Sequence, residues 1–405
     1  MTRKLDLRTG NPVWMSYRAP RVPAEPLTRD VKTDVLVVGM GISGAMIAEE
    51  LTAAGMDVVA IDRRRRPLLG STAATTALVQ YEIDQPLTKL ARGIGRDRAE
   101  RAWRRSRIAV ANLAARIDRL GINCAASPRP SLLLAGNVLG AGDLRAEAEA
   151  RRAAGLYAEY LTRGQLKDQF GIDRDGAILS PDNLALDPRK LAAGLFLAAR
   201  ARGARFYAPA EAVGFESSAK EVLTQTSGGP TIRSSHVVLA TGYELADIGP
   251  KGGHSIISTW AIATKPQKAV LWPQEALIWE ASDPYLYLRA LPDGRVICGG
   301  EDEDFQDEDA RDALIPAKAE AISRKLARLM PGLDPTPEFV WTGSFGTTAT
   351  GLPIIAPAPR RPRIHCVMGY GGNGITFSRI AAEMIRTRLT GGRDADADLF
   401  AFAGR

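Results

Sequence analysis

Apolar positions form a strand, helix and strand pattern between residues 34 and 62. Asp34–Val38 is a short apolar run that ends at a glycine, which predicts a buried parallel strand. Ser43–Ala54 is rich in Ala, Glu and Leu and predicts a helix. Asp57–Ile61 predicts a second strand, and Asp62 stands at its end. We therefore expect one βαβ-type unit near the start of the chain.

The turn between this strand and helix has the spacing G-x-G-x-x-G, at Gly39, Gly41 and Gly44. In that fingerprint the glycines make the tight turn, let backbone approach a pyrophosphate, and let the helix pack on the strand. The helix N-terminus faces the phosphates, and Asp62 can accept a hydrogen bond from a ribose hydroxyl. We predict a dinucleotide site, with a turn that only connects strand to helix as the alternative.

This βαβ-type unit does not show whether the dinucleotide is NAD or FAD. Four arginines, Arg63–Arg66, follow Asp62 and could favour a 2′-phosphate, but the acid at the strand end argues against NADP. A solvated basic loop is the expected role of the run.

Five more segments have apolar positions at helical spacing. We predict helices at 97–120, 143–160, 186–203, 314–330 and 375–389. Asp187 and Pro188 suit the N-cap and first position of the third. Residues 257–300 are predicted to form an antiparallel set of strands, with Asp293-Gly294 as a hairpin turn. Residues 1–30 contain several prolines and are expected to be irregular.

Composition is that of a globular chain with room for two or three lobes. The 405 residues are 45% hydrophobic and 24% charged, with a net charge of +7. Arginines are scattered and not interleaved with aromatics, so we expect no nucleic-acid partner. We also expect no signal peptide, no membrane span and no metal, and a structural role for the three histidines. Three widely spaced cysteines fit a reducing cytoplasm.

A second glycine-rich turn precedes the last predicted helix. Gly369, Gly371, Gly372 and Gly374 would leave backbone N–H groups open at that helix N-terminus. Such a terminus can stabilise anionic charge, for example on a reduced flavin ring. An ordinary connecting turn is the alternative.

The ordered motifs of the chain resemble the D-amino-acid oxidase-like (DAO) superfamily of FAD-dependent amine oxidoreductases, near its glycine, sarcosine and γ-glutamylputrescine oxidase group. The resemblance spans nearly the whole chain and implies an α/β fold, α+β overall. In that fold a Rossmann-like FAD-binding lobe, here 1–90, 161–245 and 345–405, interleaves with an antiparallel-sheet substrate lobe, 91–160 and 246–344. The matching segments are "NPVWMSYRAP", "DVLVVGMGISGAMIAEEL", "GSTAATTA", "HVVLATGYE", "GLPIIAP" and "GYGGNGITFS".

The resemblance also implies a set of cofactor contacts along these motifs. The first turn would hold the pyrophosphate, the hydroxyl-rich segment would line the path to the flavin ring, and the last turn would approach the ring. These residues are Gly39, Gly41, Ile42, Ser43, Gly44, Asp62, Arg63, Ser71, Thr72, Thr75, Thr76, Val213, Gly242, Gly372, Asn373, Gly374, Ile375 and Thr376.

The substrate end departs from the pattern of the family. Phe345 stands where many members carry an arginine that clamps a carboxylate. Arg289 could supply another cation, with Tyr287 on the same face of its strand, or it could be an exposed sheet residue. Tyr370 is a further candidate for substrate binding. We expect a surface role for Lys265, although a lysine near flavin could assist oxygen reduction.

The chemistry implied by the resemblance is hydride transfer from a C–H bond next to an amine to non-covalently bound FAD. An imine forms and is hydrolysed, and no protein base is required if the amine arrives neutral. Catalytic residues therefore stay unassigned. Three activities remain open: an amine or amino-acid oxidase using O2, a dehydrogenase passing electrons to a quinone or carrier protein, and a flavin-binding protein without turnover.

Overall fold

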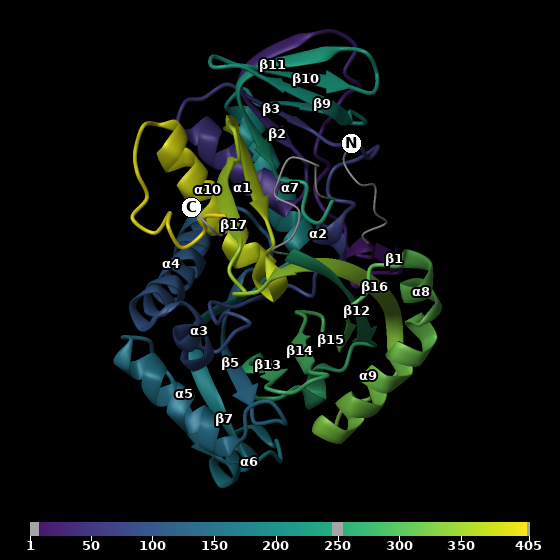
Figure 1. The fold of residues 1–405 in the computed structure, drawn as a ribbon. Helices are drawn as coiled ribbons and strands as arrows, with labels where there is room; N and C mark the ends of the chain where they lie inside the picture. The colour runs from purple at the N-terminus through teal and green to yellow at the C-terminus, as the bar shows by residue number, and fades with distance from the viewer. Residues whose placement is uncertain (1–7, 245–253, 403–405) are drawn as a thin grey trace.

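The computed structural model describes residues 8–244 and 254–402. Figure 1 shows two sheets, one in the upper part of the view with α1, α7 and α10, and one in the lower part flanked by α5, α6, α8 and α9. The chain passes between the sheets several times, because strands that are close in sequence alternate between them. The expected α/β fold, with a parallel and an antiparallel part, is confirmed.

The smaller sheet is eight-stranded and has a parallel core. Its order is β17-β18-β11-β2-β3-β8, and all neighbours from β18 to β8 are parallel. The strands are β2 (Val31–Val38), β3 (Val58–Ile61), β8 (Arg205–Tyr207), β9 (Ala212–Ser217), β10 (Val222–Thr226), β11 (Thr231–Leu239), β17 (Ile354–Ala358) and β18 (Arg361–Met368).

The larger sheet is ten-stranded, with the order β1-β16-β12-β15-β14-β13-β5-β7-β4 and β6 beside β7. Its pairs are antiparallel except β13 with β5. The antiparallel set expected at 257–300 is confirmed, since β12, β13, β14 and β15 pair with one another only in antiparallel fashion. The strands are β1 (Arg8–Gly10), β4 (Leu78–Val79), β5 (Ser127–Leu134), β6 (Glu159–Thr162), β7 (Gly176–Ala185), β12 (His254–Thr264), β13 (Leu277–Glu280), β14 (Leu286–Ala290), β15 (Val296–Glu303) and β16 (Pro337–Thr348).

Helices cover these sheets and tie them together. Helix α1 contacts both α7 and α10 beside the parallel sheet, and α9 packs on β12, β15 and β16. The helices are α1 (Ile42–Ala53), α2 (Ser71–Ala74), α3 (Leu87–Ile94), α4 (Arg96–Leu120), α5 (Ala141–Ala153), α6 (Arg163–Phe170), α7 (Pro188–Ala201), α8 (Glu308–Ala313), α9 (Ile315–Leu329) and α10 (Gly374–Leu389). The short 3₁₀ turns are η1 (Val13–Met15), η2 (Lys268–Val270), η3 (Pro273–Glu275) and η4 (Gly371–Asn373).

Four of the five predicted helices are confirmed within a few residues. In α7 the Asp187 carboxylate accepts from the backbone N–H groups of Arg189 and Lys190, as the capping pattern predicts. The fifth, predicted at 143–160, is too long, because Gly155 adopts φ +77° after the helix end and 159–162 pairs with β7. Residues 8–10 form a short strand on β16, where irregular structure was expected.

The expected lobe boundaries remain a prediction. Strand pairing places 159–162 and 176–185 in the ten-stranded sheet, although the proposed FAD-binding lobe begins at 161. The boundary at 245/246 and both chain ends lie outside the described residues. Within the described ranges, no helix has the length and apolar character needed to cross a membrane.

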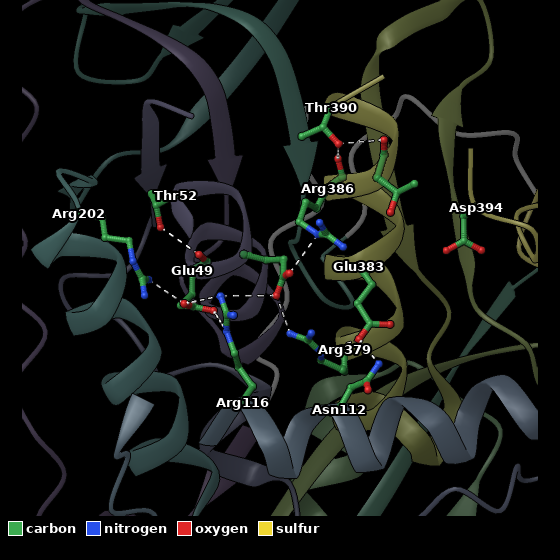
Figure 2. Close-up of polar contacts among 12 residues, drawn as sticks. Glu49, Thr52, Asn112, Arg116, Arg202, Arg379, Glu383, Arg386, Thr390 and Asp394 are labelled. Atoms are coloured by element: carbon green, nitrogen blue, oxygen red, sulfur yellow. Dashed lines mark hydrogen bonds and ion pairs between the residues drawn. The ribbon is translucent and has the colours of Figure 1, made fainter. Parts of the chain in front are cut away.

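Helix α1 is held at its far end by a buried network of carboxylates and guanidinium groups (Figure 2). Glu49 is fully buried and accepts from two arginines, Arg116 of α4 and Arg202 just after α7, with all three N···O distances at 2.7 Å. Glu50 beside it pairs with Arg379 of α10 at 2.7 Å. Adjacent acids on one helix thus join three other helices to α1.

Glu49→Gln should destabilise the fold strongly. The substitution leaves the guanidinium groups of Arg116 and Arg202 without their full counter-charge in a buried site, at a cost of about 3–5 kcal/mol. Denaturant unfolding measures this change. The control is Glu320→Gln, which breaks an exposed pair with Arg324 and should cost under about 1 kcal/mol. Equal effects of the two substitutions would contradict a central role for the network.

Candidate functional site

A cavity lies between the carboxyl ends of the parallel strands and the inner face of the ten-stranded sheet. Its lining includes both glycine turns, the hydroxyl-rich segment at 71–76 and aromatic side chains of the ten-stranded sheet. It therefore extends from the predicted nucleotide motifs to the predicted substrate side. The carboxyl edge of such a sheet is where parallel α/β folds bind nucleotides.

The first glycine turn forms one wall of the cavity by close backbone packing. Gly39 has φ +110°, and a Cβ there would lie 2.3 Å from the carbonyl oxygen of Ala240 on the neighbouring strand end. A Cβ on Gly44 would lie 1.9 Å from the Gly39 carbonyl oxygen, which confirms the predicted helix-on-strand contact. Gly44 therefore serves packing and does not line the cavity, whereas Gly39, Gly41, Ile42 and Ser43 do.

The acid at the end of β3 lies where the fingerprint predicts. Asp62 lines the cavity, and its carboxylate accepts from the backbone N–H groups of Met40 at 2.9 Å and Arg64 at 2.8 Å. Burial is the main influence on this carboxyl and raises its pKa. Each carboxylate oxygen keeps further acceptor capacity that can face a ligand hydroxyl.

The arginine run is only partly the solvated loop that we expected. Arg65 and Arg66 are exposed, but Arg63 and Arg64 line the cavity and pair with Glu244. Glu244 is buried at the end of the "HVVLATGYE" segment, close to Asp62 in space. No short-range pattern pointed to this residue, because its partners Arg63 and Arg64 lie 181 and 180 positions away.

The hydroxyl-rich segment at 71–76 forms the next part of the wall. Thr72 accepts the backbone N–H of Ile42 at 2.9 Å and so caps the start of α1. The Ser71 hydroxyl is buried and has no hydrogen-bond partner in the described part of the chain. Thr75 and Thr76 line the cavity as expected.

Three side chains from distant segments hold the carbonyl groups of residues 74–77. The indole N–H of Trp341 donates to Ala74 at 2.8 Å, and that of Trp14 donates to Thr75 at 2.6 Å. Arg289 donates to Ala77 at 2.6 Å. Ala77 has φ +58°, an unfavourable conformation for alanine that these contacts help to maintain.

Arg289 is therefore neither the substrate-binding cation nor the exposed sheet residue that the sequence suggested. It is 1% exposed, so it is not a surface residue, and it does not line the cavity, so it faces no substrate there. Its guanidinium also donates to Leu186 and lies 5.5 Å from the Trp14 ring. Desolvation lowers its pKa, although a guanidinium remains charged at neutral pH.

The second glycine turn, at η4, closes the cavity from the other side. Gly372, Asn373, Gly374 and Ile375 line it, and the Ser43 hydroxyl meets Ser378 of α10 at 2.7 Å. The N-termini of α1 and α10 therefore converge, which the sequence motifs could not show. Thr376 lies outside the cavity, because its hydroxyl donates to the Gln80 carbonyl at 2.7 Å.

The ten-stranded sheet supplies an aromatic roof. Tyr287 and Phe345 line the cavity as expected, together with Tyr285, whose ring centroid is 5.6 Å from that of Tyr287. Tyr370 also lines it and is buried, and burial raises its pKa to about 12. Trp279 of β13 completes the roof.

The remaining residues named from the sequence differ in whether they line the cavity. Gly242 lines the cavity, but Val213 is 42% exposed and does not; its neighbours Ala210, Glu211 and Ala212 take that position. Lys265 is exposed at the end of β12, away from the cavity. Among the described residues, no group of His, Cys, Asp and Glu is placed to bind a metal ion.

The walls of this cavity fit a flavin dinucleotide. A Cβ on Gly41 would lie 3.1 Å from the Thr72 hydroxyl, a tight contact, and without it the backbone of the turn stays uncovered on the cavity side. Ser71 offers an unused hydroxyl beside the helix terminus, and Asp62 offers an acceptor at the strand end. Such groups suit a pyrophosphate and a ribose respectively.

Comparison with known proteins agrees with this geometry. A family model described as FAD dependent oxidoreductase, DAO, matches residues 34–388. The gamma-glutamylputrescine oxidoreductase of Escherichia coli K12 is 24% identical over 398 residues, which cover 94% of this chain and 88% of the relative.

Two crystal structures have the same fold. Glycine oxidase from Geobacillus kaustophilus superposes with a TM-score of 0.75 at 21% identity, covering 93% of this chain and 99% of the other. L-proline dehydrogenase from P. horikoshii gives 0.76 at 18% identity, covering 92% and 97%. With a family model spanning most of its length, the chain belongs to the DAO family of FAD-dependent oxidoreductases.

Proposed function

We propose that this enzyme oxidises a C–N bond of an amine substrate, with FAD held non-covalently and O2 as electron acceptor. The observation that carries the proposal is the cavity itself, which joins two convergent helix N-termini to an aromatic roof. Gamma-glutamylputrescine oxidoreductase supports an amine as the substrate class by its name.

The first turn and its neighbours would hold the dinucleotide. Backbone N–H groups at Gly41–Ser43 and the Ser71 hydroxyl suit the pyrophosphate, and Asp62 suits the ribose. Bound FAD supplies the hydride acceptor for the carbon next to the amine nitrogen. Cys124, Cys298 and Cys366 are buried away from the cavity lining, which supports non-covalent binding.

The substrate end favours amines over simple amino acids. Phe345 presents an apolar ring where a carboxylate-binding arginine would be expected. Among the described residues that line the cavity, the basic ones are Arg63 and Arg64, both engaged by Glu244 at the nucleotide end. A carboxylate at the roof would lose hydration without a cationic partner, at a cost of several kcal/mol.

The roof can also orient the substrate and exclude water from the reacting region. Tyr285 donates its hydroxyl to Asp302 at 2.6 Å, so its ring is fixed over the cavity. Burial raises the pKa of Tyr285 and Tyr287, which keeps both hydroxyls neutral. These side chains can exclude water and position an amine that arrives neutral, without removing a proton from it.

A cytoplasmic location remains a proposal, supported by three buried cysteines that form no disulfide.

Anaerobic mixing with a panel of amines should test the proposed reaction. Larger primary and secondary amines should bleach the flavin absorbance, while glycine, sarcosine and D-alanine should do so at least about tenfold more slowly, since each carboxylate meets no cation at the roof. Rapid bleaching by glycine would show that another group binds the carboxylate. Reoxidation by O2, compared with a quinone, then identifies the acceptor, and slow reaction with O2 would favour a dehydrogenase.

Gly41→Val should abolish stoichiometric FAD binding, because the branched side chain would meet Thr72 and fill the space for the pyrophosphate. The flavin-to-protein absorbance ratio of the purified protein measures this. Gly142→Val is the control: no atom lies within 4 Å of its Cβ, and it should retain full flavin. Retained flavin in the Gly41 variant would remove this turn from the cofactor site.

Arg289→Ala should weaken the fold and FAD binding without changing substrate preference. The carbonyls of Ala77 and Leu186 would lose a buried donor, at a cost of about 1–3 kcal/mol each. Unfolding and FAD titration measure the loss, and Arg65→Ala controls for removing an exposed arginine. A change in the ratio of kcat/KM between two amines would place Arg289 against substrate after all.

A further inference from the structure

One carboxylate, that of Asp84, lines the roof end of the cavity. Asp84 lies after β4, and its Oδ2 accepts the backbone N–H of Gly372 at 2.7 Å. A Cβ on Gly371 would lie 2.4 Å from Oδ2, and one on Gly372 would lie 2.8 Å from Oδ1. The carboxylate therefore rests directly on the second glycine turn, and its residue is open to the cavity.

The surroundings of Asp84 are acidic and aromatic. Asp302 on β15 lies near Asp84, and Tyr243 and Tyr285 line the same end of the cavity. Glu82 lines the cavity too, but its carboxylate lies near the guanidinium of Arg151 and accepts from Ser131. Within residues 8–244 and 254–402, no lysine or arginine forms an ion pair with Asp84. Asp84 is accessible through the open cavity, while the protein around it partly desolvates the carboxylate. A cation that enters the cavity can therefore reach it and form a favourable ion pair.

Further acceptors in the same wall also lack donors. Asn373 is 6% exposed, and its Nδ2 donates to the carbonyls of Gln80 and Glu82, which fixes the orientation of the amide. Its Oδ1 has no donor in the described part of the molecule. One oxygen of the buried Glu82 carboxylate also lacks a partner among those residues. An ammonium group, with three donors and no acceptor, has the complementary chemistry.

We propose that Asp84 binds a positively charged nitrogen of the substrate, so that the enzyme takes diamines or longer polyamines rather than amino acids. The inference rests on the proposed amine oxidation and names its substrate class. The bound nitrogen is not the one that reacts, because a neighbouring carboxylate favours the protonated form and the reacting amine must be neutral to release hydride. Asp84 is thus a specificity-determining residue and not a base.

The aromatic roof fits the rest of such a substrate. Tyr285 and Tyr287 stand side by side and remain neutral, so their rings can cover a methylene chain and attract its charged end. Phe345 adds apolar surface from β16. A diamine can place its uncharged reacting nitrogen elsewhere in the cavity while its ammonium stays at Asp84.

Binding of three probes to the holoenzyme tests the proposal. 1,4-Diaminobutane, 1-aminopentane and 5-aminopentanoate carry an ammonium, a methyl and a carboxylate group at the same distance from a primary amine. The flavin of the holoenzyme is first reduced anaerobically with dithionite, so that no hydride can pass from the probe. Calorimetric titration should then give the diamine an affinity about 10- to 100-fold above that of 1-aminopentane, the factor expected for a hydrogen bond between charged groups. 5-Aminopentanoate should bind most weakly.

Asp84→Asn should erase this preference and leave 1-aminopentane unchanged. Asparagine can still accept the Gly372 N–H through its carbonyl oxygen, so the turn should keep its shape. Asp168→Asn, at an exposed position of α6, removes the same charge elsewhere and should retain the preference. The FAD content of each variant is measured first, because loss of flavin from Asp84→Asn would instead make this residue a cofactor contact and overturn the proposal.

Acid pH provides an independent readout. Burial raises the pKa of Asp84 to about 6, so its charge is present above that pH and is lost as the pH falls through it. The diamine preference of the wild type should decline below pH 6, while the diamine itself stays charged, and the preference of Asp84→Asn should be flat. Asp302 lies close and also has a raised pKa, so a decline that persists in Asp84→Asn would assign the effect to Asp302.

Two results would overturn the inference while leaving the proposed function intact. One is equal affinity of the wild type for 1,4-diaminobutane and 1-aminopentane, and the other is a diamine preference that survives Asp84→Asn. Failure of every amine to bleach the flavin would instead refute the proposed oxidation, since binding is measured without turnover.

Discussion

The architecture depends on the close approach of two strand ends beneath helix α1. The backbone of Gly39 lies against Ala240, and Gly44 lies against the Gly39 carbonyl, at separations that no side chain could occupy. This contact lets α1 begin directly at the sheet edge, so that its first N–H groups face the cavity. A bulkier turn would move the helix, and with it the contact between Ser43 and α10.

Fixing one end of α1 would not be enough to position it. Its other end carries Glu49 and Glu50, whose buried ion pairs reach α4, α7 and α10. Single buried ion pairs contribute little net stability, but a network with full hydrogen bonding specifies one arrangement of the helices. The glycine contact and this network together hold the helix N-terminus in a fixed relation to the parallel sheet.

The cavity wall is supported in a similar way from the other sheet. Residues 74–77 form no long helix or strand, yet their carbonyls meet donors from Trp14, Trp341 and Arg289. These donors come from η1, β16 and β14, which are far apart in sequence. The charged side chains of the cavity also differ by position. Arg63 and Arg64, paired with Glu244, lie at the nucleotide end, and Asp84, which has no ion-pair partner among the described residues, lies at the roof.

The sequence by itself determined the local units and the family. Glycine spacing, strand ends and helix caps are short-range features, so the tight turn at Gly39, the place of Asp62 at a strand end and the helix cap at Asp187 were interpreted correctly from neighbouring residues. Tertiary structure alone decided which side chains reach the cavity. Arg289 was assigned by strand alternation, which gives a face of the sheet but not what covers it, and that face is covered by Trp14 and Ala77. Glu244 and Asp84 were missed because their partners, Arg63 and Gly372, lie far away in the chain, and only folding brings such charges together.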